Sequence, residues 1–193
     1  MSYPELYILR HGETEWNAQN RMQGWLNSPL TQQGQMQAAR QYEILRGRDL
    51  NGFQALSSPL GRCVQTAGIA VAPLITEVRT DARLREIGVG DWQGQVRTEL
   101  IWEGDQLNGP DGPLGMYAAA PGGEGFEVLS RRCVDLLGAL EGPTVLVTHG
   151  ITSRMLRMMI MGHSWDDLAT MAALPGGQGV VYHMKDGQQV KLD

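Results

Sequence analysis

Two short apolar runs that each end at a His-Gly pair constrain the fold of this chain more than any other feature. Residues 6–9 lead through Arg10 into His11-Gly12, and residues 144–148 lead directly into His149-Gly150. Short apolar runs bounded by glycine or polar residues predict buried strands. Open α/β sheets bind ligands outside the carboxyl ends of their strands. We therefore expect both histidines at a ligand-binding edge of one sheet.

The rest of the chain supplies further strands, helices and two long loops. We expect strands at 53–57 and 76–80, helices at 31–48, 61–72, 96–102 and 124–141, and a closing hairpin at 178–184 and 188–192. Residues 155–161 are rich in methionine, which predicts core packing rather than a metal or cofactor site. Residues 13–30 are predicted to form a loop, and the Gly- and Pro-rich loop 104–123 is expected to form a lid. One domain covering residues 1–193 is the expected organisation.

Composition excludes several classes of partner. The net charge of −5 argues against nucleic-acid binding, for which a basic face would be expected. Two cysteines are too few for a disulfide framework, and no apolar run approaches membrane-spanning length. The first residues lack the basic and apolar regions of a secretion signal. We expect a cytoplasmic protein with a small-molecule substrate, no nucleic-acid partner and no membrane contact, and we leave the oligomeric state open.

The residues at these strand ends suit phosphoryl chemistry. Phosphoryl transfer needs a nucleophile, cations that spread the charge of the phosphoryl oxygens, and a proton donor for the leaving oxygen. His11 suits the first role if its imidazole is neutral, and nearby arginines would lower its pKa. Arg10, Arg62 and His149 suit the second role, because guanidinium groups match phosphate oxygens bidentately. Arg62 is expected in the first turn of a helix, where an anion is favoured.

Glu86 suits the third role, although a lone glutamate in such a stretch is more often a solvated charge. It can donate a proton to the leaving oxygen and then activate water for hydrolysis of a phosphohistidine. The amide of Asn17 can donate to a phosphoryl oxygen. A metal site is the rival chemistry, but the sequence has no His-x-His, Asp-x-Asp or Cys pair at ligand spacing, and two arginines in the pocket would repel a dication. We expect no metal and no cofactor.

These segments, taken together, resemble a known family. The chain is similar to the histidine phosphatase superfamily, in its phosphoglycerate-mutase-like branch. The matching residues run in the family's order: 9–17, Arg21, 23–24, 29–34, 37–38, 58–59, Arg62, 65–67, Leu84, Glu86, 92–94 and 148–150. The resemblance implies a three-layer α/β/α sandwich with a mostly parallel, Rossmann-like central sheet.

The resemblance also implies roles for individual residues. It assigns catalysis to His11, Glu86, Arg10, Arg62 and His149, and phosphate or substrate binding to Asn17, Gln23, Gly24 and Gly150. It gives Glu13 an orienting role behind His11. The implied activity is that of a phosphomonoester phosphatase that forms a phosphohistidine at His11.

Two alternatives remain open at this point. A non-catalytic phosphate-binding module is the first, although every polar group that turnover needs is present. A phosphoglycerate-type mutase is the second, and it would need cations for a second phosphate. Residues 98–130 contain no lysine or arginine and carry six acidic residues, which favours the phosphatase, while Arg21 and Arg97 could partly compensate. The sequence does not identify the alcohol part of the substrate.

Overall fold

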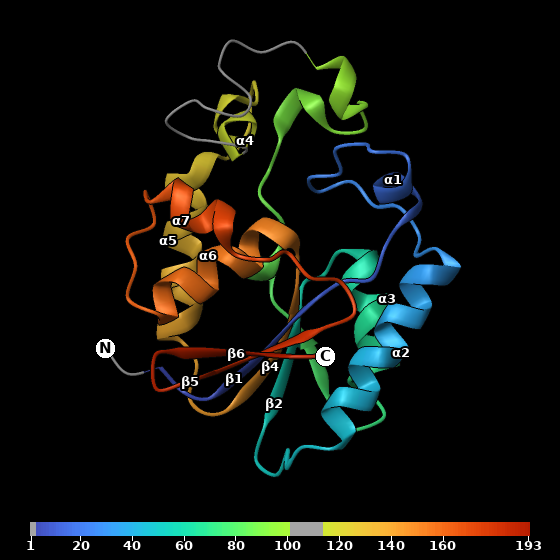
Figure 1. Cartoon of the computed structure of the whole chain (residues 1–193), viewed down its shortest axis with the longest axis vertical. Coiled ribbons are helices and arrows are strands. Elements are labelled where there is room, and N and C mark those ends of the chain that lie inside the picture. Colours follow the sequence, from blue (N-terminus) through green and yellow to red (C-terminus); the bar gives the residue numbers. More distant parts are fainter. Residues whose placement is uncertain (1–2, 101–113) are drawn as a thin grey trace.

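A six-stranded sheet forms the centre of the molecule in a computed structural model that describes residues 3–100 and 114–193 (Figure 1). The strands are β1 (Leu6–Arg10), β2 (Gln54–Ser57), β3 (Val78–Thr80), β4 (Thr144–Thr148), β5 (Val181–Lys185) and β6 (Gln188–Leu192). Their order in the sheet is β3-β2-β4-β1-β5-β6. The first four strands of this order are parallel, and β5 and β6 are antiparallel to their neighbours. The expected mostly parallel sheet is confirmed.

Helices cover both faces of the sheet, and the alternation of side chains along β1 shows why. Leu6 and Ile8 point to one face and join the core cluster built with α5 (Gly125–Gly138) and α6 (Gly150–Ile160). Tyr7 and Leu9 point to the other face, toward α2 (Gln32–Arg46) and α3 (Gly61–Ala70). Both faces are therefore buried, as expected for a parallel sheet. The three-layer arrangement is visible in Figure 1 and confirms the expected fold class.

Helix boundaries follow local sequence signals. Thr31 caps α2 by accepting a hydrogen bond from the Gly34 amide at 3.0 Å, and the helix ends at Arg46, followed by Gly47 as its C-cap. The buried residues of α5 recur at helical spacing and include Phe126, Leu129 and Cys133. Among the helices in the described residues, none is long and apolar enough to cross a membrane.

Three segments differ from the expectation. The predicted loop 13–30 contains a short helix, α1 (Glu15–Ala18), because Thr14 and Asn17 cap each other's backbone amides reciprocally. Within the described part of the predicted helix 96–102, the chain forms only a 3₁₀ turn (Arg97–Glu99). A further helix, α7 (Leu168–Ala173), begins where the Asp167 side chain accepts from the Thr170 amide, and the sequence analysis did not predict it.

The predicted lid at 104–123 is described only in part. Residues 104–113 lie outside the described residues. The remaining part is not a loop throughout, because it contains the helix α4 (Gly115–Ala119). Leu114, Met116 and Ala120 bury their side chains in the same core cluster as α5 and α6, which accounts for the ordered turn of helix there. A lid function for this segment stays a prediction.

Candidate active site

The register of β1 and β4 brings the two predicted histidines together. Arg10 pairs with Thr148 across the parallel strands, so His11 and His149 leave the sheet side by side. The His11 amide donates to the Thr148 carbonyl at 3.0 Å. The two imidazole rings lie edge to face, with centroids 5.2 Å apart and planes at 62°. Residues separated by 138 positions in the chain thus form one pair at the carboxyl edge of the sheet.

The environment of His11 fixes both its charge and its tautomer. Nδ1 lies 2.7 Å from the Gly12 carbonyl oxygen, which can only accept, so Nδ1 carries the proton. The lone pair of the neutral ring is then on Nε2. Burial lowers the pKa of His11 well below its ordinary value, and the charges of Arg62 and Arg10 lower it further. His11 is therefore a neutral imidazole at neutral pH with Nε2 unprotonated.

Glycines allow the loop after His11 to lie against two helices. The Gly12 amide donates to Thr66 Oγ1 of α3 at 3.1 Å. A Cβ atom on Gly12 would lie 2.2 Å from the Gly34 carbonyl oxygen, and one on Gly34 would lie 2.0 Å from the Glu13 carbonyl oxygen. Any larger residue at either position would push α2 away from the His11 loop. The Glu13 carboxylate accepts from Thr31 Oγ1 at 2.8 Å, while the group that holds the His11 ring is the Gly12 carbonyl.

Arg62 is almost fully buried in the first turn of α3, with 1% of its surface exposed. Its guanidinium donates to the carbonyls of Leu26 (2.7 Å) and Gly24 (2.8 Å), and its Nε donates to Nδ1 of His149 (3.2 Å). Because a guanidinium has five N–H groups, these three bonds leave two donors for a ligand. The same contacts tie the 24–26 loop to the site.

Arg10 carries donors that the described residues do not satisfy. One terminal nitrogen donates to the Gly176 carbonyl at 3.1 Å. Its Nε is buried and has no hydrogen-bond partner among the described residues. The guanidinium lies against Gly150, where a Cβ would approach Cζ to 3.3 Å. An unpaired buried donor costs about 1–3 kcal/mol, and an anionic ligand in the adjacent cavity would remove that cost.

His149 is fully buried and is held on both ring nitrogens. Nδ1 accepts from Arg62, so Nε2 carries the proton and donates to Ser58 Oγ at 2.8 Å. Burial lowers its pKa well below the ordinary value, with Arg62 and His11 as further causes. Cys63 packs against the same ring, with Sγ 3.3 Å from Nε2, and burial raises the pKa of this thiol to about 12. The cysteine is therefore an unreactive thiol beside the histidine.

Glu86 is held at the N-terminus of α6. Its Oε1 accepts from the Ile87 amide (3.0 Å) and from the Thr152 amide (3.1 Å), and it lies 3.1 Å from the Thr152 hydroxyl, whose one proton is shared with the Arg85 carbonyl. Its Oε2 accepts only from the Ile151 amide, at 3.2 Å, among the described residues. A carboxylate at this end of a helix is favoured by the helix dipole. Oε2 keeps a lone pair that can hold or receive a proton.

Asn17 and Gln23 complete the polar lining around the Thr14 cap. Asn17 Oδ1 accepts from the Thr14 amide (3.2 Å) and from Gln178 Nε2 (3.3 Å), which orients its NH₂ group away from these partners. Gln23 donates to Thr14 Oγ1 at 2.8 Å, and its buried Oε1 has no partner among the described residues. The NH₂ group of Asn17 and Oε1 of Gln23 thus stay available for hydrogen bonds to a ligand.

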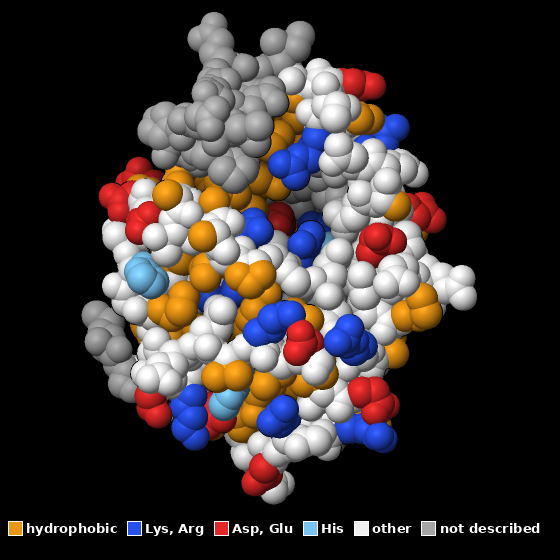
Figure 2. All heavy atoms as spheres, viewed as in Figure 1, with side chains coloured by type: hydrophobic (Ala, Val, Ile, Leu, Met, Phe, Trp, Pro, Cys, Tyr) orange, Lys and Arg blue, Asp and Glu red, His pale blue; other side chains and the backbone are white. Residues whose placement is uncertain are grey.

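These groups surround one cavity of about 260 Å³. In Figure 2 it is the hollow near the middle of the face, with basic side chains around it. Seven predicted site residues line it: Arg10, His11, Asn17, Gln23, Gly24, Arg62 and Glu86. His149 and Gly150 are not among the described lining residues; His149 contacts His11 and Arg62, and Gly150 lies against Arg10.

The comparison with known protein families matches this geometry to one superfamily. Residues 6–192 match the histidine phosphatase superfamily (branch 1). The chain belongs to the histidine phosphatase superfamily. The resemblance derived from the motifs is confirmed, and the superfamily consists of enzymes that include phosphatases and mutases of small phosphorylated substrates.

Relatives of both kinds are found. The chain is 37% identical over 169 residues to the probable phosphoglycerate mutase GpmB of Salmonella paratyphi C, an alignment that covers 82% of this chain and 75% of the relative. It is similar to the crystal structure of a phosphoglycerate mutase from Thermus thermophilus, with a TM-score of 0.73, 28% identity and 98% of each chain covered. It is also similar to a mycobacterial glucosyl-3-phosphoglycerate phosphatase in complex with VO₃, with a TM-score of 0.74, 29% identity and coverage of 98% and 97%.

Further residues that line the cavity come from distant segments of the chain. Gln178 was missed by the sequence analysis, as were Asn20, Met22, Val89 and Tyr117. The only signal for Gln178 is its place in the glycine-rich stretch before β5. Arg21 and Arg97 also line the cavity; Arg21 donates to the Gly94 carbonyl at 2.9 Å, and the Arg97 guanidinium lies 5.7 Å from the centroid of the Tyr117 ring.

The described residues, 3–100 and 114–193, contain no group of three or more His, Cys, Asp or Glu side chains that could hold a metal ion. The guanidinium groups of Arg62 and Arg10 place positive charge close enough to His11 to lower the pKa of its ring.

Proposed function

We propose that this chain is a metal-independent phosphatase that hydrolyses a small phosphomonoester through a phosphohistidine at His11. One observation carries the proposal. A neutral histidine with a free Nε2 shares a cavity with unsatisfied arginine donors and with the Glu86 carboxyl. This combination supplies a nucleophile, charge stabilisation and a proton donor without a metal ion.

The first half-reaction transfers the phosphoryl group to the enzyme. His11 Nε2 attacks phosphorus as the bond to the leaving oxygen breaks, and Glu86 Oε2 gives its proton to that oxygen. Arg10 and Arg62 donate to the phosphoryl oxygens, with Asn17 and Gln23 as additional polar partners. In the second half-reaction Glu86 takes a proton from water, the water oxygen attacks phosphorus, and the bond to Nε2 breaks to release inorganic phosphate.

His149 is assigned a role that fits its hydrogen bonds. Its Nδ1 accepts from Arg62 and its Nε2 donates to Ser58, so it positions the guanidinium that contacts the phosphoryl group. Gly24 supports the same guanidinium through its carbonyl, and Gly150 allows Arg10 to approach the start of α6. Direct contact between His149 and the phosphoryl group stays a prediction, because it requires Nε2 to leave Ser58.

A phosphoglycerate-type mutase is the second candidate, and a specific observation favours it. Arg21 and Arg97 line the same cavity as Arg10 and Arg62, so cations are available for a second anionic group. The relative named probable phosphoglycerate mutase supports the same interpretation. Two of the acidic residues that the sequence analysis set against a mutase, Glu124 and Glu127, do not line the cavity and pair with Arg132 and Arg131.

Product analysis separates the two activities. The purified protein should release inorganic phosphate from members of a phosphomonoester panel, after exhaustive chelation and without stimulation by 2,3-bisphosphoglycerate. Vanadate should compete with the substrate. Interconversion of 2- and 3-phosphoglycerate faster than phosphate release would establish the mutase instead. A strict requirement for added magnesium or zinc would contradict the metal-independent mechanism.

A further inference from the structure

The segment that carries Glu86 is held by side chains rather than by a strand ladder. Four consecutive backbone carbonyls, from Arg83 to Glu86, each accept a hydrogen bond from a side chain elsewhere in the chain. The donors are Arg132 to Arg83 (2.6 Å), Thr148 to Leu84 (2.7 Å), Thr152 to Arg85 (2.7 Å), and both Trp25 (2.8 Å) and Arg132 (3.1 Å) to Glu86. Irregular backbone in a protein interior needs such partners, and here they fix every peptide around the carboxylate.

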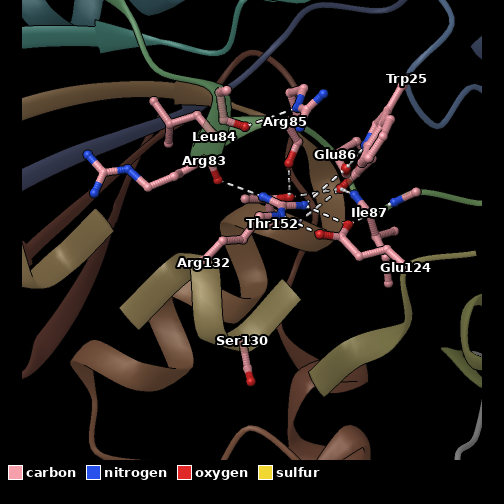
Figure 3. A network of polar contacts seen from close by, with 12 residues as sticks. Trp25, Arg83, Leu84, Arg85, Glu86, Ile87, Glu124, Ser130, Arg132 and Thr152 are labelled. Atoms are coloured by element: carbon pink, nitrogen blue, oxygen red, sulfur yellow. Dashed lines mark hydrogen bonds and ion pairs between the residues drawn. The ribbon is translucent and has the colours of Figure 1, made fainter. Parts of the chain in front are cut away.

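Arg132 contributes two of these bonds and is itself held by Glu124. Its Nε donates to Oε1 of Glu124 at 2.6 Å and a terminal nitrogen donates to Oε2 at 3.0 Å, a bidentate pair. Oε2 of Glu124 also accepts from the Gly88 amide at 3.0 Å. The pair therefore contacts the segment at both ends, before and after Glu86. Figure 3 shows Arg132 on α5 lying between the Arg83 carbonyl and the Glu124 carboxylate.

The burial of this ion pair distinguishes it from its neighbour on the same helix. The side chains of Arg132 and Glu124 are 13% and 7% exposed, whereas those of Arg131 and Glu127 are 69% and 64% exposed. A buried pair is weak evidence for stability, because desolvation offsets much of the attraction. Its planar, bidentate geometry instead fixes the positions of the groups it joins.

We propose that the Arg132–Glu124 pair is a positioning device for Glu86, which keeps its carboxyl group aligned with the leaving oxygen. The carboxylate end of Glu86 is held by Thr152 and the start of α6, while its backbone is held by Arg132 and Trp25. If the Arg132–Glu124 pair is broken, the Glu86 carboxylate keeps its hydrogen bond to Thr152, but its position relative to the leaving oxygen of the substrate shifts. This inference rests on the proposed function, in which Glu86 is the proton donor.

If the pair positions Glu86, the loss of activity in variants of the pair should depend on the leaving group of the substrate. An alkoxide must be protonated as the bond to phosphorus breaks, whereas 4-nitrophenolate leaves without a proton. Displacing Glu86 should therefore slow an alkyl phosphate and spare an activated aryl phosphate. Loss of general stability, by contrast, would lower the activity toward both substrates equally.

The test compares benzyl phosphate with 4-nitrophenyl phosphate through kcat/KM, which reports the steps up to phosphoenzyme formation. Arg132→Lys and Glu124→Gln should lower kcat/KM for benzyl phosphate by about 10- to 100-fold and for 4-nitrophenyl phosphate by less than about threefold. Arg131→Gln, which breaks the exposed pair on the same helix, is the matched control and should leave both values unchanged.

Trp25→Phe and Glu86→Gln complete the design. Trp25 is 41% exposed, so its replacement probes the Glu86 carbonyl even if the buried variants fail to fold, and it should show the same leaving-group selectivity in weaker form. Glu86→Gln should show the selectivity most strongly. If Glu86→Gln lacks it, the proposed role of Glu86 is wrong. If Glu86→Gln shows it while the other variants slow both substrates equally or neither, only the positioning inference is overturned.

Discussion

Nδ1 of His11 lies 2.7 Å from the carbonyl oxygen of Gly12, and this contact selects Nε2 as the nitrogen that can react. Burial and the charges of Arg62 and Arg10 keep the same ring neutral by lowering its pKa. The reactive form of the enzyme is therefore present without any further proton acceptor for the imidazole. The pH dependence of activity and of stability both follow from this arrangement.

The acid limb of the pH–rate profile should lie well below pH 6.5, the ordinary value for histidine. His11 attacks only when neutral, and its lowered pKa extends the neutral form to lower pH. Arg10→Gln removes one of the charges that lower this pKa, so the limb should move to higher pH as the rate falls. Arg40→Gln, on the exposed face of α2, should not move it. The measurement is kcat/KM as a function of pH, corrected for the ionisation of the substrate's phosphate group at about pH 6.

Stability should fall as the pH drops below about 6.5. His11 and His149 have lowered pKa values in the folded protein, so between about pH 6.5 and their folded values the unfolded chain binds more protons. The free energy of unfolding then falls by up to about 1.4 kcal/mol per pH unit for each histidine. Urea denaturation from pH 7.5 to 5.5 measures this slope. His149→Gln should flatten it, whereas replacing the exposed His163 by Gln should not.

Arg62→Lys should lower kcat/KM by at least about 10²- to 10³-fold and weaken vanadate inhibition. A lysine ammonium cannot donate at once to Gly24, Leu26, His149 and a phosphoryl oxygen, as the guanidinium can. Arg46→Lys, in an exposed pair with Glu43, is the control and should retain full activity. Wild-type kcat/KM in Arg62→Lys would show that the guanidinium does not serve the transition state.

Arg21 and Arg97 should determine how strongly the protein prefers substrates that carry a second anionic group. Arg21→Gln and Arg97→Gln should raise KM for 3-phosphoglycerate by about 10- to 100-fold per lost charged contact, because a charge-assisted hydrogen bond contributes about 1.5–3 kcal/mol. KM for 4-nitrophenyl phosphate, whose 4-nitrophenyl group carries no charge in the bound substrate, should change little. The exposed Arg79→Gln is a matched control. Equal effects on both substrates would contradict the assignment.

The part of the fold and site that the sequence predicts is the part that strand register determines. Arg10 and Thr148 pair because two buried runs lie parallel, so the juxtaposition of His11 and His149 follows from a pattern visible in the chain. Arg62 is likewise placed by the first turn of a helix after a strand. For these residues, the pattern of apolar runs and of the residues that follow them is enough to predict where they lie.

Other positions depend on loop packing, which local spacing does not encode. Gln178 meets Asn17 across 161 residues, and Tyr117 reaches the cavity from α4, within a segment predicted to be a loop. The α1 helix was missed because its capping box uses Asn17 where Glu or Gln is usual. From the sequence, Glu124 was expected to repel a second phosphate group, but in the structure it pairs with Arg132.

A phosphoenzyme on Nε2 of His11 is the most direct test of the account. Rapid acid-free quenching after mixing with a phosphate-labelled substrate should trap label that is stable in base and labile in acid. Fragmentation of the labelled peptide and ³¹P NMR should assign it to Nε2 of His11, and His11→Ala should lose both the label and turnover by several orders of magnitude. Turnover in His11→Ala at the wild-type rate, or label on another residue, would contradict the central claim.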